Sequence, residues 1–122
     1  MKRPAVLTIA GSDCSGGAGI QADLKTMTAF GVYGMSVITA VTAQNTTGVY
    51  GIQKISGEMV ASQLDAVFAD IVPAAVKIGM LADGKTAGIV AEKLLQYGAE
   101  NIVVDPVMLS TSGSPLLDRG GV

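Results

Sequence analysis

The sequence predicts an α/β fold with a three-layer α/β/α arrangement, in which helices cover the faces of a mostly parallel sheet. Short apolar runs alternate with helical patterns along the 122 residues and give three strand–helix–strand passes. Charged residues are only 15% of the chain, which indicates buried parallel strands or a surface that something else covers. No linker, repeat or low-complexity tract marks a second domain, so residues 1–122 are expected to lie in one domain.

The first strand is expected at Val6–Ala10 and runs into the glycine-rich turn Gly11–Gly19, which holds four glycines. A helix over Ile20–Phe30 follows, with Phe30 on its apolar face and Gly31 as its end. Such a turn aims backbone N–H groups at a polar ligand. It is no Walker A loop, because no Lys-Ser or Lys-Thr follows, and it matches the dinucleotide fingerprint only loosely. A tight connection without a ligand is the alternative.

A second strand is expected at Met35–Thr42, where β-branched residues are frequent. It ends in Ala43–Gly48, a loop of amides and hydroxyls. Ligands of open α/β sheets bind beyond the carboxyl ends of the strands, so Gln44 is expected there, level with the glycine-rich turn. Its amide suits a ring that bears nitrogens and an amino group. The alternative is an amide that ties down its own loop.

Val49–Ile55 alternates loosely and is typical of an accessory strand or a hairpin. Ser56 is a candidate N-cap for an amphipathic helix that Pro73 ends. The third core strand is expected at Ala75–Leu81. Met80 near its end points either into a pocket or into the core.

Asp83 is expected to cap a helix that reaches Tyr97, and Asn101–Asp105 is the fourth strand. Two carboxylates have open roles. Asp105 either caps the next turn or acts on a metal ion or a phosphate-bearing ligand. Asp23 either interacts with the helix dipole or hydrogen-bonds a ligand held in the glycine-rich turn.

Composition excludes several classes of function. The net charge of −2 without a basic tract argues against a nucleic-acid partner. The absence of histidine excludes His-based triads, His metal sites and His general bases from this chain. The single cysteine, Cys14, allows no internal disulfide and indicates a reducing compartment. No apolar stretch is long enough for a bilayer, so a cytoplasmic protein without a membrane partner is expected.

Several motifs in the same order resemble the hydroxymethylpyrimidine/phosphomethylpyrimidine kinases of thiamine biosynthesis, members of the ribokinase-like superfamily. The resemblance covers essentially the whole chain. It rests on Ile9–Asp23, Thr39–Thr46, Lys77–Leu81, Val104–Met108 and the loop Thr111–Gly113.

The resemblance implies an enzyme that uses ATP and Mg²⁺ to phosphorylate 4-amino-5-hydroxymethyl-2-methylpyrimidine and then its monophosphate. It implies that Gln44 hydrogen-bonds the aminopyrimidine edge, and that Asp105 lies near the phosphates and the metal. The partner is then this small aminopyrimidine alcohol, and a homodimer of the full-length protein is left open. The other implied substrate-pocket residues are Gly11, Ala18, Asp23, Met80 and Val107.

The chain departs from the family in length, because family members are about twice as long. Their ATP site and anion hole lie in a C-terminal half with a Gly-Thr-Gly-Cys-type turn, which this sequence lacks. Residues 1–122 are therefore expected to be the N-terminal half of one ribokinase-like kinase domain, without catalytic residues of its own and inactive alone. The alternatives are a pyridoxine/pyridoxal kinase and a non-catalytic pyrimidine-binding or interaction module. A third alternative is one half of a dinucleotide-binding oxidoreductase, which is disfavoured because the ribose-binding acidic residue is absent.

Overall fold

The structure is a computed structural model and describes residues 3–105 of the chain. Three helices and six strands lie along these residues. In chain order they are β1 (Ala5–Ala10), α1 (Gly19–Ala29), β2 (Tyr33–Ile38), β3 (Ala40–Asn45), β4 (Gly48–Lys54), α2 (Gly57–Phe68), β5 (Ala75–Ile78), α3 (Gly84–Gln96) and β6 (Ile102–Val104).

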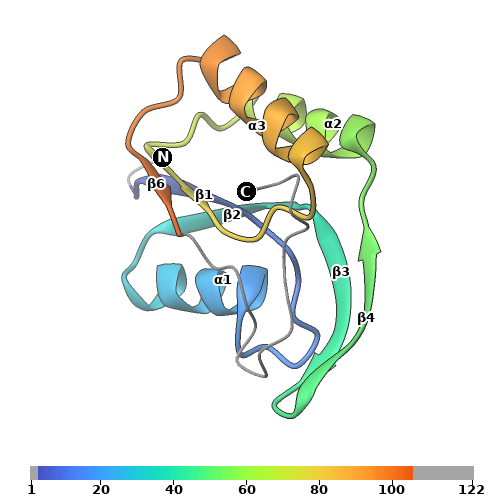
Figure 1. Cartoon of the computed structure of the whole chain (residues 1–122). Coiled ribbons are helices and arrows are strands. Elements are labelled where there is room, and N and C mark those ends of the chain that lie inside the picture. The colour runs from blue at the N-terminus through green and yellow to red at the C-terminus, as the bar shows by residue number, and fades with distance from the viewer. Residues whose placement is uncertain (1–2, 106–122) are drawn as a thin grey trace.

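Four strands form a parallel sheet in the order β2-β1-β5-β6, and β3 pairs with β4 in a separate antiparallel ribbon. Helix α1 covers one face of the parallel sheet, and α2 and α3 cover the other (Figure 1). The ribbon projects from the carboxyl end of β2 (Figure 1). The predicted α/β class with a mostly parallel sheet is therefore confirmed.

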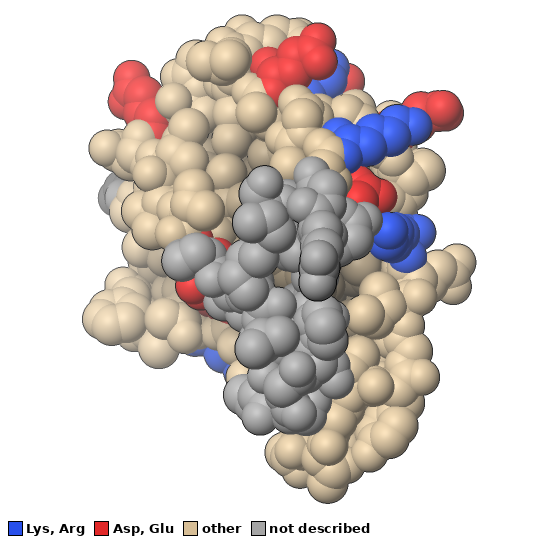
Figure 2. Space-filling model, in the orientation of Figure 1, with Lys and Arg blue, Asp and Glu red and all other residues tan. Residues whose placement is uncertain are grey.

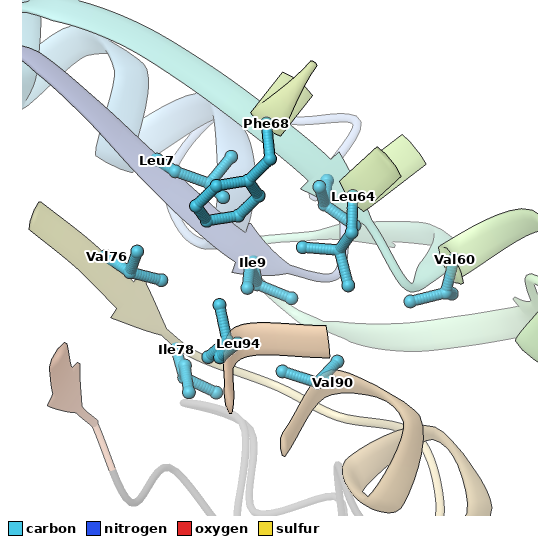
Figure 3. Close-up of a cluster of buried hydrophobic side chains, with 10 residues drawn as sticks. Leu7, Ile9, Val60, Leu64, Phe68, Val76, Ile78, Val90 and Leu94 are labelled. Atoms are coloured by element: carbon cyan, nitrogen blue, oxygen red, sulfur yellow. The ribbon is translucent and has the colours of Figure 1, made fainter. Parts of the chain in front are cut away.

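The main core lies between the sheet and helices α2 and α3, where apolar side chains from all of these elements meet (Figure 3). Alternate residues of a strand face opposite sides of the sheet, so Leu7 and Ile9 point to this core and Thr8 points to α1. The core residues include Leu7, Ile9, Val37, Val60, Leu64, Phe68, Val76, Ile78, Val90 and Leu94.

The predicted second strand, Met35–Thr42, is wrong as a single element, because the chain leaves the parallel sheet at Thr39. The Thr39 N–H donates to Ala10 O, and its hydroxyl donates to Met80 O. Its own carbonyl accepts from Ile55 N–H, at the point where the ribbon returns. Frequent β-branched residues before and after Thr39 concealed this change, since both strands favour the same residue types.

The predicted starts of α2 and α3 are confirmed. Ser56 and Asp83 cap α2 and α3 by accepting from Met59 N–H and Thr86 N–H, respectively. Two expectations were wrong: Phe30 is 81% exposed rather than buried, and α2 ends at Phe68, well before Pro73. Phe30 is the C-cap residue of α1, so it no longer follows the buried stripe of the helix.

The surface carries few charges in the view of Figure 2. Lys, Arg, Asp and Glu side chains gather mainly along its upper and right margins, while the lower lobe of the β3–β4 ribbon is uncharged (Figure 2). None of the helices in residues 3–105 is long and apolar enough to cross a membrane.

Candidate functional site

The chain reverses its direction across the sheet between β1 and β5. From β1 the chain crosses to β2 through α1, and it then returns through α2 on the other face to β5, on the opposite side of β1. In open α/β sheets, ligands bind outside the carboxyl ends of the strands at such a switch point. The residues that follow β1 and β5 are the glycine-rich turn and the segment Gly79–Met80, and they define the candidate site.

The glycine-rich turn is attached to β3 by several hydrogen bonds. Ser12 N–H donates to Ala40 O (2.8 Å), and the Thr42 hydroxyl donates to Ser12 O (2.5 Å). Further along, the Cys14 thiol donates to Gln44 O (3.2 Å), and Gln44 N–H donates to the Cys14 sulfur (3.3 Å). Because both segments are tied residue by residue, the turn and β3 form one rigid wall of the site.

Asp13 organises the turn from within. Its carboxylate accepts from the hydroxyl and N–H of Ser15 (2.7 and 2.9 Å) and from Gly17 N–H (3.0 Å). Burial alone would raise the pKa of Asp13, but these hydrogen bonds, together with one from the Gln44 side chain, hold the pKa below its usual 3.8. Asp13 is therefore an ionised structural group that shapes the turn.

Gln44 lies within β3 rather than in a loop beyond the strand, which corrects the predicted position. A bulge in the β3–β4 pairing falls between Ala43 and Gln44, and such bulges re-aim side chains. The Gln44 amide oxygen accepts from the Thr42 hydroxyl at 3.2 Å, and its side chain also reaches Asp13. As predicted, Gln44 is level with the glycine-rich turn.

Gly11 and Met80 pack directly against each other. A Cβ on Gly11 would overlap the Met80 terminal methyl group, so a larger residue at this position would require the Met80 side chain to move. Met80 is buried and also packs with Ala40 and Ala82. Met80 thus belongs to a small core cluster. Because this cluster borders the site, the position of Met80 combines the two expected roles, in the core and at a pocket.

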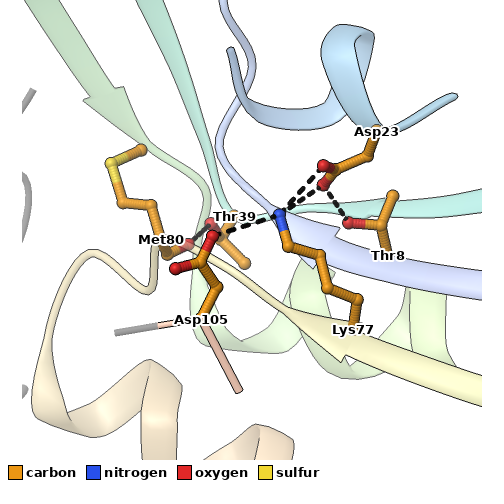
Figure 4. A network of polar contacts seen from close by, with 6 residues as sticks. All are labelled: Thr8, Asp23, Thr39, Lys77, Met80 and Asp105. Carbon is orange, nitrogen blue, oxygen red and sulfur yellow. Dashed lines mark hydrogen bonds and ion pairs between the residues drawn. The ribbon is translucent and has the colours of Figure 1, made fainter. Parts of the chain in front are cut away.

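Ala18 is the N-cap residue of α1 and is exposed at the rim of the turn. Asp23 lies on the second turn of α1. An interaction with the helix dipole would place a carboxylate in the first turn, which holds no acidic residue. Its carboxylate accepts from Lys77 Nζ at 2.8 and 2.9 Å and from the Thr8 hydroxyl at 2.6 Å (Figure 4). Asp23 therefore forms an ion pair between α1 and the sheet.

Asp105 follows β6 immediately, and its N–H donates to Ile78 O at 2.8 Å. Its carboxylate lies 3.9 Å from Lys77 Nζ, on the side of the ammonium opposite to Asp23 (Figure 4). Its side chain is 47% exposed, so the carboxylate is partly open to a ligand. Val107, the remaining candidate, lies outside the described residues.

The described residues fit a magnesium ion that is shared with phosphates. They contain no group of three or more His, Cys, Asp or Glu that could hold a metal ion alone. Mg²⁺ in phosphoryl-transfer sites needs only one or two carboxylates, because phosphates and water supply the other ligands. The open carboxylate of Asp105 meets this requirement.

Lys77 is the site residue that the sequence analysis missed. It stands in a core strand between Val76 and Ile78, which are both buried. Lysine is almost never buried unless it is paired, so a lone lysine in an apolar run was itself a signal of a carboxylate partner.

A family model described as "Phosphomethylpyrimidine kinase" matches residues 13–122. A hydroxymethylpyrimidine/phosphomethylpyrimidine kinase of Escherichia coli is 56% identical over 122 residues, which are 100% of this chain and 46% of the relative. The chain thus spans about half the length of this curated relative.

Two solved structures extend the comparison. A phosphomethylpyrimidine kinase from Clostridium difficile 630 superposes with a TM-score of 0.91 at 53% identity, over 98% of this chain and 52% of that chain. A Staphylococcus aureus pyridoxal kinase in complex with AMP-PCP and pyridoxal gives a TM-score of 0.78 at 37% identity, over 87% of this chain and 40% of that chain.

Proposed function

The chain belongs to the phosphomethylpyrimidine kinase family, and from this membership we propose that the intact protein is an ATP-dependent kinase of an aminopyrimidine alcohol. The substrate is 4-amino-5-hydroxymethyl-2-methylpyrimidine, and its monophosphate receives a second phosphoryl group. Residues 1–122 form the N-terminal half of a single ribokinase-like domain in this proposal. The coverage of longer relatives supports this division.

The proposed ring pocket lies between the glycine-rich turn and β3. Gln44 hydrogen-bonds the amino group and a ring nitrogen of the substrate. In the free protein, the Gln44 side chain bonds to Thr42 and Asp13 instead. Met80 provides apolar contact to one ring face, while Gly11 and Ala18 leave room for the ring at the turn. Val107 contributes a further apolar contact. Asp23 acts on this pocket from its place on α1, through its bonds to Lys77 and Thr8 rather than through a direct bond to the ring.

The proposed phosphate side begins at Asp105. Magnesium bound there with ATP would neutralise charge on the transferring phosphoryl group. In this chain, the Asp105 carboxylate would hold that cation at the edge of β6, and β5 separates Asp105 from the wall proposed to bind the ring. The residues beside the reacting hydroxyl are assigned to the part of the domain beyond this chain.

One observation carries the proposal. The switch point between β1 and β5 gathers a hydrogen-bonding wall at Gln44 and an open carboxylate at Asp105 at the same edge of the sheet. A kinase of a small ring alcohol needs both of these features, because the ring must be oriented and the phosphates neutralised.

The test is ATP-dependent turnover by the intact protein. We expect the pyrimidine alcohol and its monophosphate both to be phosphorylated, with ADP formed in equal amount. Calorimetry with the pyrimidine alone provides the companion measurement. Binding without any turnover would instead support a non-catalytic pyrimidine-binding module.

Pyridoxal kinase activity is the second candidate, because solved pyridoxal kinases share this fold at 37% identity. The identity to the phosphomethylpyrimidine kinase from Clostridium difficile is higher, at 53%, and this difference favours the pyrimidine. The two are separated by assaying pyridoxal and the pyrimidine alcohol side by side. A kcat/KM that is higher for pyridoxal would overturn the choice of substrate.

A further inference from the structure

Lys77 occupies an inner strand of the sheet and faces α1. Its neighbours in register are Thr8 on β1 and Val103 on β6. Figure 4 shows its side chain running along the sheet, with the ammonium group between the carboxylates of Asp23 and Asp105. The ammonium thus lies at the junction between the glycine-rich half of the site and the Asp105 half.

The two carboxylates use this ammonium unequally. Asp23 binds it through both oxygens, accepts a third bond from Thr8, and has a side chain only 17% exposed. Asp105 approaches it through one oxygen at 3.9 Å and is 47% exposed. Asp23 is therefore the more fully bonded of the two and serves as the anchor of Lys77, whereas Asp105 keeps more of its capacity to accept.

We propose that Lys77 is a positioning residue: its ammonium is a built-in counter-ion for Asp23 and Asp105 together, so that a divalent cation meets Asp105 alone, on its solvent side. The proposal rests on the proposed function only in assuming that this cation arrives with the nucleotide. Lysine suits the role because its ammonium is a compact point charge with three donors.

The charges explain why the Lys77 ammonium is needed between the two carboxylates. The Lys77 ammonium and the two carboxylates carry a net charge of −1, which would become −2 without the lysine. Three carboxylate oxygens lie within 4 Å of Nζ, at 2.8, 2.9 and 3.9 Å. If the ammonium were absent, a divalent cation with oxygen ligands would be drawn into its place and would bridge both carboxylates.

Binding of Mn²⁺ to the intact protein, without nucleotide or substrate, tests the proposal directly. Free Mn²⁺ is measured by electron paramagnetic resonance for the wild type and for Lys77→Met, which keeps most of the length of the side chain and removes its charge. We expect Lys77→Met to bind Mn²⁺ at least about tenfold more tightly, because an uncompensated pair of carboxylates attracts the ion. Lys77→Arg should stay within about threefold of the wild type, because it restores the charge.

Lys93 provides a matched control. It forms a similar ion pair, 2.8 Å from Asp65, and its side chain is 22% exposed, but it bonds to only one carboxylate in the described part of the chain. Lys93→Met should therefore leave Mn²⁺ affinity unchanged. The double variant Asp23→Asn/Lys77→Met should lose the gain of Lys77→Met, because only Asp105 then remains.

Asp23→Asn is the second variant, used if circular dichroism shows that Lys77→Met does not fold. It leaves the ammonium to Asp105 alone, so Mn²⁺ should bind at least about threefold more weakly than to the wild type. Unchanged Mn²⁺ affinity in the folded Lys77→Met protein, or an equal gain in Lys93→Met, would overturn the proposal. If Lys77→Met does not fold, unchanged affinity in Asp23→Asn would do so. The Mn²⁺ assay contains no substrate, so its result does not depend on activity. A wild type that phosphorylates neither ring alcohol would therefore contradict the proposed function and leave the proposal about Lys77 to be decided by Mn²⁺ binding.

Discussion

The glycine-rich turn after β1 and the edge strand β6 present opposite kinds of surface. At the turn, the polar groups are paired with one another, and no buried side-chain N or O atom in the described residues lacks a hydrogen-bond partner. At β6, the side chains of Ile102, Val103 and Val104 are 44%, 62% and 62% exposed. Beside β6 lies an apolar groove of about 330 Å³, lined by Ile78, Ala91, Leu94, Leu95, Gly98, Ala99 and Ile102.

The difference shows which part of this chain can fix the orientation of a ligand. Hydrogen bonds have strict geometry, so the turn and β3 can hold a ring in one orientation. Exposed apolar groups on both sides of a strand have no such directionality, and inner strands of parallel sheets are normally covered on both faces. Our proposal therefore assigns recognition of the ring to the turn, whereas β6 offers surface area.

Gly19→Ala should have the largest effect, because it breaks the turn. Gly19 has φ +58°, and a Cβ there would collide with the carbonyl of Gly11. Positive φ and backbone overlap together should lower the free energy of unfolding by at least about 3 kcal/mol. Urea denaturation measures the change.

Gly88→Ala is the control for this substitution. Gly88 lies in α3, and a Cβ there would meet no atom within 4 Å. It should raise stability by about 0.5–1 kcal/mol, because alanine favours helix. Similar losses in both variants would show that the turn is no more constrained than an exposed helix.

Asp13→Asn should lower stability by about 2 kcal/mol at pH 7, because charge-assisted bonds to Ser15 and Gly17 are weakened. The depressed pKa of Asp13 gives stability that is complete above its unfolded-state value near 3.8 and is lost as the pH falls through the lower folded-state pKa. The wild type should therefore lose stability in this acidic range more steeply than Asp13→Asn.

Thermal unfolding between pH 2 and 7 compares these slopes. Asp70→Asn, at an exposed aspartate, should change stability by less than about 0.5 kcal/mol at pH 7. Parallel pH profiles for the wild type and Asp13→Asn would remove Asp13 from the account of the turn.

If the proposed function is correct, Gln44→Ala in the intact protein raises the KM for the pyrimidine at least about tenfold, equivalent to about 1.4 kcal/mol from lost hydrogen bonds to the ring. Gln53→Ala, at an exposed amide of β4, is the control and should leave KM unchanged. Steady-state kinetics with saturating ATP provide both values. Equal KM values for the two variants would exclude Gln44 from the ring pocket.

Val104→Thr should have the smallest effect, below about 0.5 kcal/mol, because the side chain is 62% exposed in this chain. Val76→Thr, the same change at a position 1% exposed, should cost about 2 kcal/mol. Urea denaturation compares the pair. Equal costs would show that β6 is covered as fully as β5 and would remove the contrast with the turn.

Most of the fold could be predicted from the sequence, because strong periodic signals coincide with good caps. Ser56 and Asp83 mark helix starts, and Gly31 and Gly98 mark helix ends with positive φ. The break at Thr39 could not be predicted, since the residues on both sides favour strand equally. Only the tertiary bonds of Thr39 to Ala10, Met80 and Ile55 reveal it.

The candidate site was predicted in part. Gln44 and the glycine-rich turn were placed together correctly, because strand ends and turns follow local rules. The pairing of Asp23 with Lys77 depends on residues 54 positions apart, and no local pattern encodes that distance. Whether each of these residues contacts substrate stays a prediction.

A crystal structure of the intact protein with 4-amino-5-hydroxymethyl-2-methylpyrimidine tests the central claim most directly. The account predicts the ring beside the glycine-rich turn, with the Gln44 amide about 3 Å from the exocyclic amino group and a ring nitrogen. A ring bound elsewhere, with Gln44 still bonded to Thr42 and Asp13, would contradict it.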